Sequence, residues 1–380
     1  MKKALATILA LVMALSVTTM AWADDVAKIG GTGYATLQEA VDAATNDQTI
    51  VLQSNVVLTA SLNVAAGKTV TLDLNSCKIT ADMNGPHMIC NAGNLTITDS
   101  SENKTGEIAK IGAETNFGYV IENHGTMTLD RCKISSTSVK SSAIENGWYT
   151  ASANTAGTSC TMTIQNAEVV SVNAAGGLYT VKNDDYGVMV INGGVFTNGV
   201  AGAGAVLNWN DLTINGGTFT GASAVRTLKS GSSDFETGKS QIKNGTFNGG
   251  IDTLDGYKTG ITIAVTGGTF STDVTEYLAE GKILQKNGDT YTAVTNSGIT
   301  SGTYTSQPTV PSGYKATKND DGTWTVTKIS YYYYPSTSDT TTSTTTKGSP
   351  KTFDAGIALY VGMALTSAAG VAFVGKKRED

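Results

Sequence analysis

Apolar and polar residues alternate with a period of two in many short stretches of this chain. In the segment Leu212–Phe219, apolar side chains stand at Leu212 and Ile214 with a Thr between them, and Asn-Gly-Gly-Thr-Phe follows. Alternation with this period predicts a short strand with one buried face. The Gly pair permits a positive φ, so the chain can turn a corner there. The segment therefore predicts a strand, a corner and the start of a second strand.

The same phrase recurs along the chain, which predicts a repeat architecture. Four copies end in Phe196, Phe219, Phe247 and Phe270, which are 23, 28 and 23 positions apart. An aliphatic residue precedes each Phe by five positions: Ile191, Ile214, Ile242 and Val265. Weaker copies precede them and share this spacing: Leu74 with Ile79, Leu129 with Ile134, and Ile164 with Val169. Ile97 matches the aliphatic residue that begins a copy, but Glu102 stands five positions later, where an apolar residue belongs. We therefore expect the chain to loop out after Ile97 and to resume the repeat near Ile108.

A unit of two or three short strands with Gly corners predicts one coil of a parallel β-solenoid. The phrases resemble those of the right-handed parallel β-helix in pectin-lyase-like proteins. The resemblance implies an all-β fold, with a right-handed parallel β-helix of about nine coils over residues 50–270. It also implies that like residues stack, so that Phe196, Phe219, Phe247 and Phe270 form a core ladder.

The ends of a solenoid need to be covered. Thr36 and Glu39 form a capping-box pattern, and apolar residues then follow with helical spacing, which predicts a short capping helix in an N-terminal cap over residues 24–49. Residues 271–330 predict a small C-terminal cap with a helical turn at Asp273–Glu280. Two segments with a turn before a Thr/aromatic strand, Lys286–Thr292 and Lys318–Thr325, predict β-hairpins in this cap.

Residues 1–23 have the pattern of a signal peptide. Two Lys residues precede an apolar stretch, and Ala21 and Ala23 form a small-x-small cleavage site. The alternative is an uncleaved membrane anchor. The short stretch and the cleavage site favour export of the chain that follows.

The C-terminal part of the chain predicts a stalk and a membrane segment. The stalk, residues 331–352, is rich first in Tyr and then in Ser and Thr, and it ends in a sorting motif. Residues 353–380 predict a transmembrane helix followed by a basic cytoplasmic tail. The span Ile357–Gly375 carries no charge and would be about 29 Å long as a helix, close to the thickness of a bilayer core. The motif before it resembles the LPxTG-type sorting signals of Gram-positive surface proteins: Ser349, Pro350, Lys351, Thr352 and Phe353. The resemblance implies cleavage after Thr352 by sortase and attachment to peptidoglycan, so the chain would contact the membrane through this helix before processing. Ser349 and Phe353 replace the Leu and Gly of that pattern, and a retained membrane anchor is the alternative.

Composition narrows the function classes. Charged residues make up 15% of the chain and the net charge is −6, which argues against a nucleic-acid partner. The four cysteines contain no CxxC pair, so we predict no metal site and no cofactor. In the predicted register Cys77 and Cys132 lie two coils apart, about 9.6 Å, so we predict free thiols.

Carboxylate pairs are the first place to look for catalysis on this fold. The candidates are Asp184 with Asp185, Asp252 with Asp255, and Asp73 with Asp99. The phrases Asn183–Asp185 and Asn123–Gly125 resemble two polygalacturonase signatures, but they occur in the wrong order and lack the third phrase. We therefore predict no catalytic residue and a non-catalytic, adhesin-like or structural protein of the Gram-positive cell surface. A polysaccharide lyase or glycoside hydrolase is the alternative.

Aromatic residues outside the repeated phrases are candidates for ligand contact. An outward aromatic ring can stack on a sugar, and an exported β-helix offers a long face for an extracellular glycan or protein. The candidate glycan contacts are Trp148, Tyr149, Tyr179, Tyr186 and Trp209.

Overall fold

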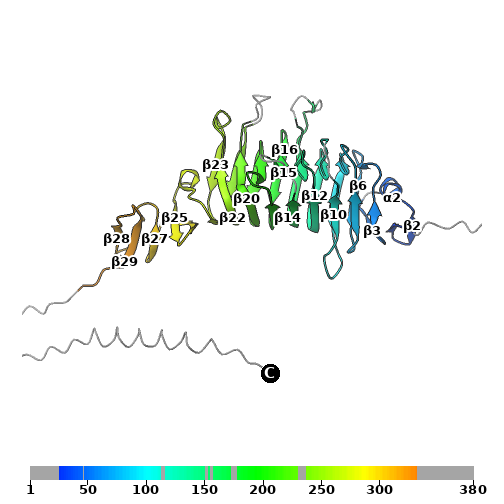
Figure 1. Cartoon of the computed structure of the whole chain (residues 1–380). Coiled ribbons are helices and arrows are strands. Elements are labelled where there is room, and N and C mark those ends of the chain that lie inside the picture. Colours follow the sequence, from blue (N-terminus) through cyan, green and yellow to red (C-terminus); the bar gives the residue numbers. More distant parts are fainter. Residues whose placement is uncertain are drawn as a thin grey trace, which may run out of the picture. The chain divides into compact units, whose positions relative to one another are not determined.

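The computed structural model describes residues 25–45, 47–112, 116–149, 153–154, 157–172, 178–229 and 237–331. These residues form an all-β fold with one long sheet whose strands are mostly parallel (Figure 1). The prediction of an all-β fold with parallel strands is confirmed.

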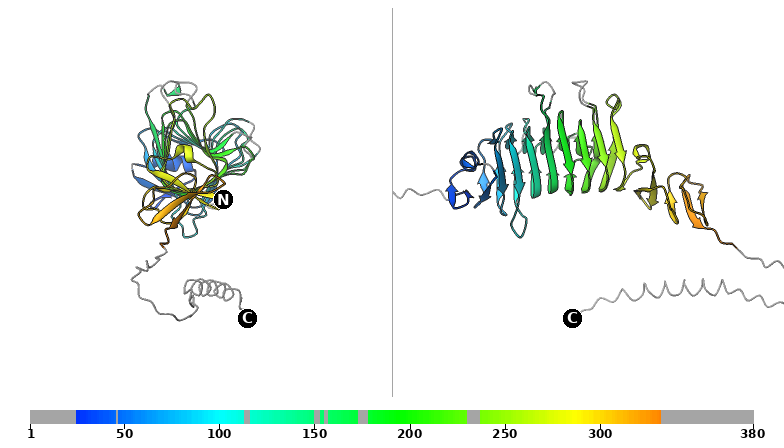
Figure 2. Two further views of the ribbon diagram at one scale, coloured as in Figure 1. Left: turned by 90° about the vertical axis from the view of Figure 1, so that its left-hand side faces the viewer. Right: turned by 180° about the vertical axis from the view of Figure 1, so that it is seen from behind.

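The parallel strands stack in three columns, and the chain passes through each column in turn before it returns to the first. We call one such passage a rung. The first column holds β3 (Gln48–Leu52), β6 (Thr69–Asp73), β9 (Asn94–Thr98), β12 (Thr126–Ser136), β14 (Cys160–Ser171), β16 (Gly187–Ile191), β19 (Asp211–Ile214), β21 (Lys239–Ile242) and β23 (Thr262–Val265). Figure 2 shows the same stack from its end and from behind.

The other two columns follow in the same order along the chain. The second holds β4 (Val56–Val57), β7 (Lys78–Ala81), β10 (Glu107–Lys110), the later parts of β12 and β14, β17 (Gly194–Asn198), the starts of β20 (Thr218–Thr227) and β22 (Thr246–Asp252), and β24 (Thr269–Phe270). The third holds β5 (Leu62–Val64), β8 (Ile89–Asn91), β11 (Ile121–Asn123), β13 (Ile144–Asn146), β15 (Tyr179–Asn183), β18 (Gly204–Asn208) and the ends of β20 and β22.

The register of the second column confirms the predicted Phe ladder. The rings of Phe196, Phe219, Phe247 and Phe270 are all buried, and neighbouring ring centroids lie 4.9, 5.0 and 4.9 Å apart. Their planes differ by 5–8°. Stacked rungs repeat at about this spacing, so identical side chains at identical positions are held face to face.

The earlier copies of the repeat are confirmed in part. Ile108 pairs with Ile79 and Ile134, so the chain does resume at Ile108 after the expected loop. The assignment of Leu74 was wrong, because Leu72 and not Leu74 pairs with Ile97. Both leucines are buried. A shift of two residues leaves the same face inward, so alternation alone could not separate them.

A ladder of buried Asn side chains runs inside the third column. The side-chain amide of each Asn donates to the side-chain oxygen of the next, from Asn91 through Asn123, Asn146 and Asn183 to Asn208, at 2.7–2.8 Å. The last amide donates to Ser240 Oγ at 3.0 Å. Each Asn is at most 2% exposed. Buried polar groups that are fully paired make a column rigid, which fixes the outward residues beside it.

The N-terminal end is covered by a small cap. Strand β1 (Ala27–Ile29) pairs antiparallel with β2 (Thr32–Tyr34) and with β3. Helix α2 spans Leu37–Ala43, and Thr36 and Glu39 form the predicted capping box. Its buried face consists of Leu37, Ala40 and Val41, which join the core.

The C-terminal cap is antiparallel. It contains the 3-10 turn η2 (Thr275–Tyr277) and the strands β25 (Lys282–Asn287), β26 (Thr290–Thr295), β27 (Gly302–Tyr304), β28 (Tyr314–Lys318) and β29 (Trp324–Lys328). The two predicted hairpins are β25–β26 and β28–β29. Tyr291 of β26 pairs with Phe270 and packs on the core, so the cap closes the end of the Phe ladder.

The predicted signal peptide, the predicted stalk beyond Tyr331, the predicted sorting motif and the apolar span 357–375 lie outside the described residues. No helix within the described part of the chain is long and apolar enough to cross a membrane.

Candidate functional site

The outward positions of the third column form a line of polar side chains across four successive rungs. Cys90, Glu122, Glu145 and Lys182 pair in register on β8, β11, β13 and β15, with about 4.8 Å between neighbouring strands. We call these four residues the central strip. The inward neighbours on the same strands belong to the Asn ladder, so the strip sits on a rigid support.

Aromatic residues that precede the strands lie on one side of the strip. His87 and Tyr119 stack with their centroids 5.1 Å apart, and Phe117 meets Tyr119 edge-on at 4.9 Å. The backbone N–H of Tyr119 donates to His87 Nδ1 at 3.0 Å, so the proton of a neutral His87 sits on Nε2. That atom lies 3.3 Å from Glu122 Oε1, so the ring is oriented toward the strip.

A second set of aromatic residues follows the strands and lies on the other side. His124 and Trp148 stack with their centroids 4.4 Å apart and their planes within 3°. Tyr186 meets Trp148 edge-on at 6.2 Å. His124 Nε2 lies 3.9 Å from Glu122 Oε1. The carboxyl group of Glu122, which is 20% exposed, is therefore bordered by a ring on each side.

Tyr149 contacts the first aromatic set and lies against Lys182 of the strip. Its ring meets Phe117 edge-on at 5.8 Å, and the ammonium of Lys182 lies 4.8 Å from its centroid. The Tyr149 side chain is nevertheless 66% exposed and Phe117 is 47% exposed. An apolar, solvent-exposed face of this kind is uncommon on a polar surface and suits stacking on a ligand.

Beneath this surface lies a buried network of charge. Lys182 Nζ donates to Asp184, and it lies 3.9 Å from Glu145 Oε1. Burial raises the pKa of Glu145 from 4.5 to about 9, which favours the protonated form of this residue at neutral pH. Lys182 is the one ammonium that the described residues place beside Glu145 and Asp184.

Burial also shifts the pKa values of other titratable groups at the site. Burial raises the pKa of Glu122, and it raises the pKa of Cys90 to about 11, so Cys90 is a neutral thiol. Burial lowers the pKa of His124, which favours its neutral form. A thiol in this state is a poor nucleophile, so a cysteine–histidine mechanism is disfavoured here.

The structure divides the five predicted glycan contacts into two groups. Trp148, Tyr149 and Tyr186 come together around the strip. Tyr179 is 4% exposed and packs with Leu207 and Leu228, so it presents no ring to solvent. Trp209 is half-buried in the same cluster and lies 6.1 Å from the ring of Tyr257.

The other candidate carboxylate pairs have structural partners. Asp73 and Asp99 accept bonds from backbone N–H groups of turns, including Ser100 N at 2.9 Å and Gly106 N at 2.6 Å. Asp252 receives both arms of Arg226 at 2.6 and 2.9 Å. Asp255 pairs instead with Lys258 at 2.8 Å. Within the described residues, no group of three His, Cys, Asp or Glu side chains could hold a metal ion.

Sequence reasoning missed six residues of this site: His87, Phe117, Tyr119, Glu122, Glu145 and Lys182. A usable signal was present, because a three-residue pattern recurs in the sequence: an aliphatic residue, then any residue, then Asn. It occurs at Ile89–Asn91, Ile121–Asn123, Ile144–Asn146, Val181–Asn183 and Val206–Asn208. The middle residue of each triplet points outward, and four of these triplets supply the strip.

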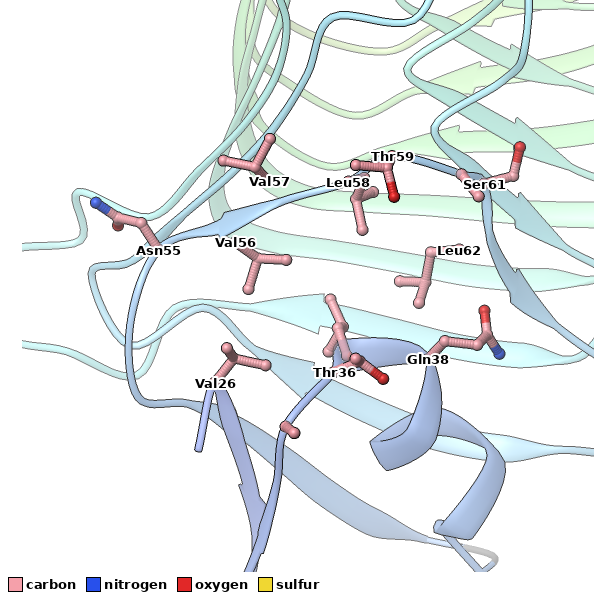
Figure 3. Close-up of a pocket in the computed structure, with 13 residues that line it drawn as sticks. Val26, Thr36, Gln38, Asn55, Val56, Val57, Leu58, Thr59, Ser61 and Leu62 are labelled. Carbon is pink, nitrogen blue, oxygen red and sulfur yellow. The ribbon is translucent and has the colours of Figure 1, made fainter. Parts of the chain in front are cut away.

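A separate apolar pocket of about 360 Å³ lies between the N-terminal cap and the first rung. Figure 3 shows Val26, Thr36 and Gln38 on the cap side, with Val56, Leu58 and Leu62 of the first rung opposite. The lining also includes the polar side chains of Asn55, Thr59 and Ser61, but no Asp, Glu, Lys, Arg or His side chain. It contains no acid–base pair, so we place the candidate site at the strip.

Comparison of this chain with models of protein families, with curated proteins and with solved structures found no match.

Proposed function

We propose that this protein is a non-catalytic, glycan-binding protein of the Gram-positive cell surface. In this proposal the stacked rungs form a right-handed parallel β-helix with a capping helix, and the central strip with its flanking rings is the binding site. The observation that carries the proposal is the pair of aromatic sets, His87–Tyr119–Phe117 and His124–Trp148–Tyr186, on either side of Glu122. Sugars bind to proteins through stacking on aromatic faces together with a few polar contacts, and this surface offers both.

The size of the strip sets the length of the ligand. Four rungs at about 4.8 Å each make a contact line of about 14 Å between the first and the last residue. The site therefore suits a short stretch of an extended chain rather than one ring in a deep cavity. Weak contacts of this kind gain strength when many copies are displayed on one surface.

Replacement of Trp148 tests the binding site. We expect Trp148→Ala to reduce binding on a glycan array at least tenfold, because the Trp148 ring is lost and the ring of His124 loses the partner on which it stacks. Trp148→Phe should retain part of the binding. Trp324→Ala, a matched change in β29 of the C-terminal cap, should bind normally. Equal binding by Trp148→Ala and the parent protein would place the ligand elsewhere.

Cell-surface attachment is a separate part of the proposal and has its own measurement. We expect export, cleavage after Ala23 and cleavage between Thr352 and Phe353 by sortase. Mass spectrometry of protein released from the wall should find Thr352 joined to a peptidoglycan stem. Recovery of the intact tail in the membrane fraction would leave the retained membrane anchor as the explanation.

A glycoside hydrolase or polysaccharide lyase is the second candidate, and one observation favours it. Glu145 is protonated beside the carboxylate of Asp184, and two carboxyl groups with different protonation states are what acid–base chemistry on a glycan requires. Both residues are at most 3% exposed, so neither reaches a bound sugar in this conformation. Release of new reducing ends or unsaturated products by the parent, lost in Glu145→Gln, would establish the enzyme instead.

A further inference from the structure

The charge of the central strip limits which glycans can bind there. The strip and its surroundings carry four carboxyl groups, Glu122, Glu145, Asp184 and Asp185, and the only ammonium that the described residues place among them is Lys182. Glu145 is neutral, and Lys182 is already bonded to Asp184. His124 is held toward its neutral form by burial. Among the described residues, the basic groups nearest to the Glu122 carboxyl are the rings of His87 and His124, at 3.3 and 3.9 Å, and no Lys or Arg side chain pairs with it.

A second observation concerns a buried acceptor beside Glu122. Glu145 is 1% exposed, and its Oε1 atom has no hydrogen-bond partner among the described residues. The ammonium of Lys182 lies 3.9 Å away, which is too far for a hydrogen bond. A buried acceptor without a donor is rare. Glu145 pairs in register with Glu122 on the neighbouring strand, so a positive charge placed at Glu122 would act on this acceptor electrostatically, from about one strand spacing away and without touching it.

We infer that the site selects glycans that carry protonated amines, such as glucosamine polymers, over neutral and acidic glycans. The inference rests on the proposed function, because it assigns a ligand class to the same strip. An ammonium group between the rings of His87 and His124 would pair with Glu122 and face the electron-rich sides of nearby aromatic rings. A uronic acid in that place would bring its own negative charge beside the carboxyl group of Glu122, and like charges repel.

Calorimetric titration with defined hexasaccharides tests the ligand class. The probes are the hexamers of glucosamine, N-acetylglucosamine and galacturonic acid at pH 6.5, each at low and high NaCl. We expect the glucosamine hexamer to bind about tenfold more tightly than its acetylated form, since one partly buried charge pair contributes on the order of 1.4 kcal/mol. The galacturonate hexamer should bind more weakly than both. High salt should reduce the differences in affinity among the three hexamers, because salt screens the interactions between charges.

Two carboxylate variants assign the preference to the strip. Glu122→Gln should bring the glucosamine and N-acetylglucosamine affinities to within about twofold of each other, with the second one unchanged. Glu168→Gln is the matched control, because Glu168 is an exposed carboxylate that pairs with Lys133 in the second column. It should retain the preference of the parent.

The possible results separate this inference from the proposed function. Equal affinity of the parent for the amine and the acetylated hexamer, or tighter binding of galacturonate, would overturn the inference. A preference that survives in Glu122→Gln would also overturn it. If these results come with loss of binding in Trp148→Ala, glycan binding at the strip stands and only the ligand class is wrong. If no hexamer binds, the proposed function and the inference both fail.

Discussion

The Asn ladder provides the most direct test of how the site is supported. In Asn146→Ala the amide of Asn123 loses its acceptor at 2.7 Å, and the side-chain oxygen of Asn183 loses its donor at 2.8 Å. Both partners are fully buried, so water cannot replace the missing groups without opening the core. The Asn123 amide still donates to the backbone oxygen of Thr161 at 3.0 Å, so the substitution leaves one buried atom, Asn183 Oδ1, without its donor and removes one bond from a second rung.

The size of the effect follows from these two changes. An unsatisfied buried acceptor costs about 1–3 kcal/mol and a lost hydrogen bond about 0.5–1.5 kcal/mol, so together they lower the free energy of unfolding by about 1.5–4.5 kcal/mol. The strip residue Glu145 precedes Asn146 and Trp148 follows two residues later, so we also expect weaker glycan binding. The damage should reach both neighbouring rungs, because each rung of a stacked fold depends on the next.

Equilibrium unfolding in urea measures the change, and the surface of the same protein supplies the control. Asn192 makes an equivalent pair of side-chain bonds, to Gln165 and from Asn215, each 2.8 Å long. Because these residues are exposed, Asn192→Ala should change the free energy of unfolding by no more than about 0.5 kcal/mol. Equal effects of the two substitutions would refute the argument that buried pairing supports the column.

Three further predictions concern the core, the buried charge and the thiols. Phe219→Ala should lower the free energy of unfolding by about 3–5 kcal/mol, and a near-neutral shift in melting temperature would contradict its place between two stacked rings. The pKa of Glu145 is raised in the folded state. Above pH 4.5 the unfolded chain releases the Glu145 proton while the folded protein keeps it, so the free energy of unfolding falls as the pH rises toward 9. Glu145→Gln should therefore gain stability relative to the parent between pH 5 and pH 8, by up to about 1.4 kcal/mol per pH unit in urea unfolding, and parallel pH profiles would argue against a protonated Glu145. Thiol titration in denaturant without reductant should find all four cysteines free, whereas two or none would reveal a disulfide: Cys77, Cys90, Cys132 and Cys160.

Much of the stacking could be predicted from the sequence because the repeated phrase is short and local. Each of the four Phe residues stands five positions after an aliphatic residue of the first column, so the rings meet although the intervals between them are 23, 28 and 23 residues. Alternation with a period of two identified the inward faces in the same way. It could not choose between Leu72 and Leu74, because both face inward and only the pairing with Ile97 distinguishes them.

The candidate site depended on tertiary structure for a physical reason. Its strands, β8, β11, β13 and β15, are separated by insertions of different length, so the Asn residues of the ladder recur at irregular intervals along the chain. Hydrogen bonding between rungs restores a common register that the sequence spacing conceals. Only this register places Glu122 between rings that belong to different rungs, such as His87 and His124, and encloses Glu145 deeply enough to change its charge.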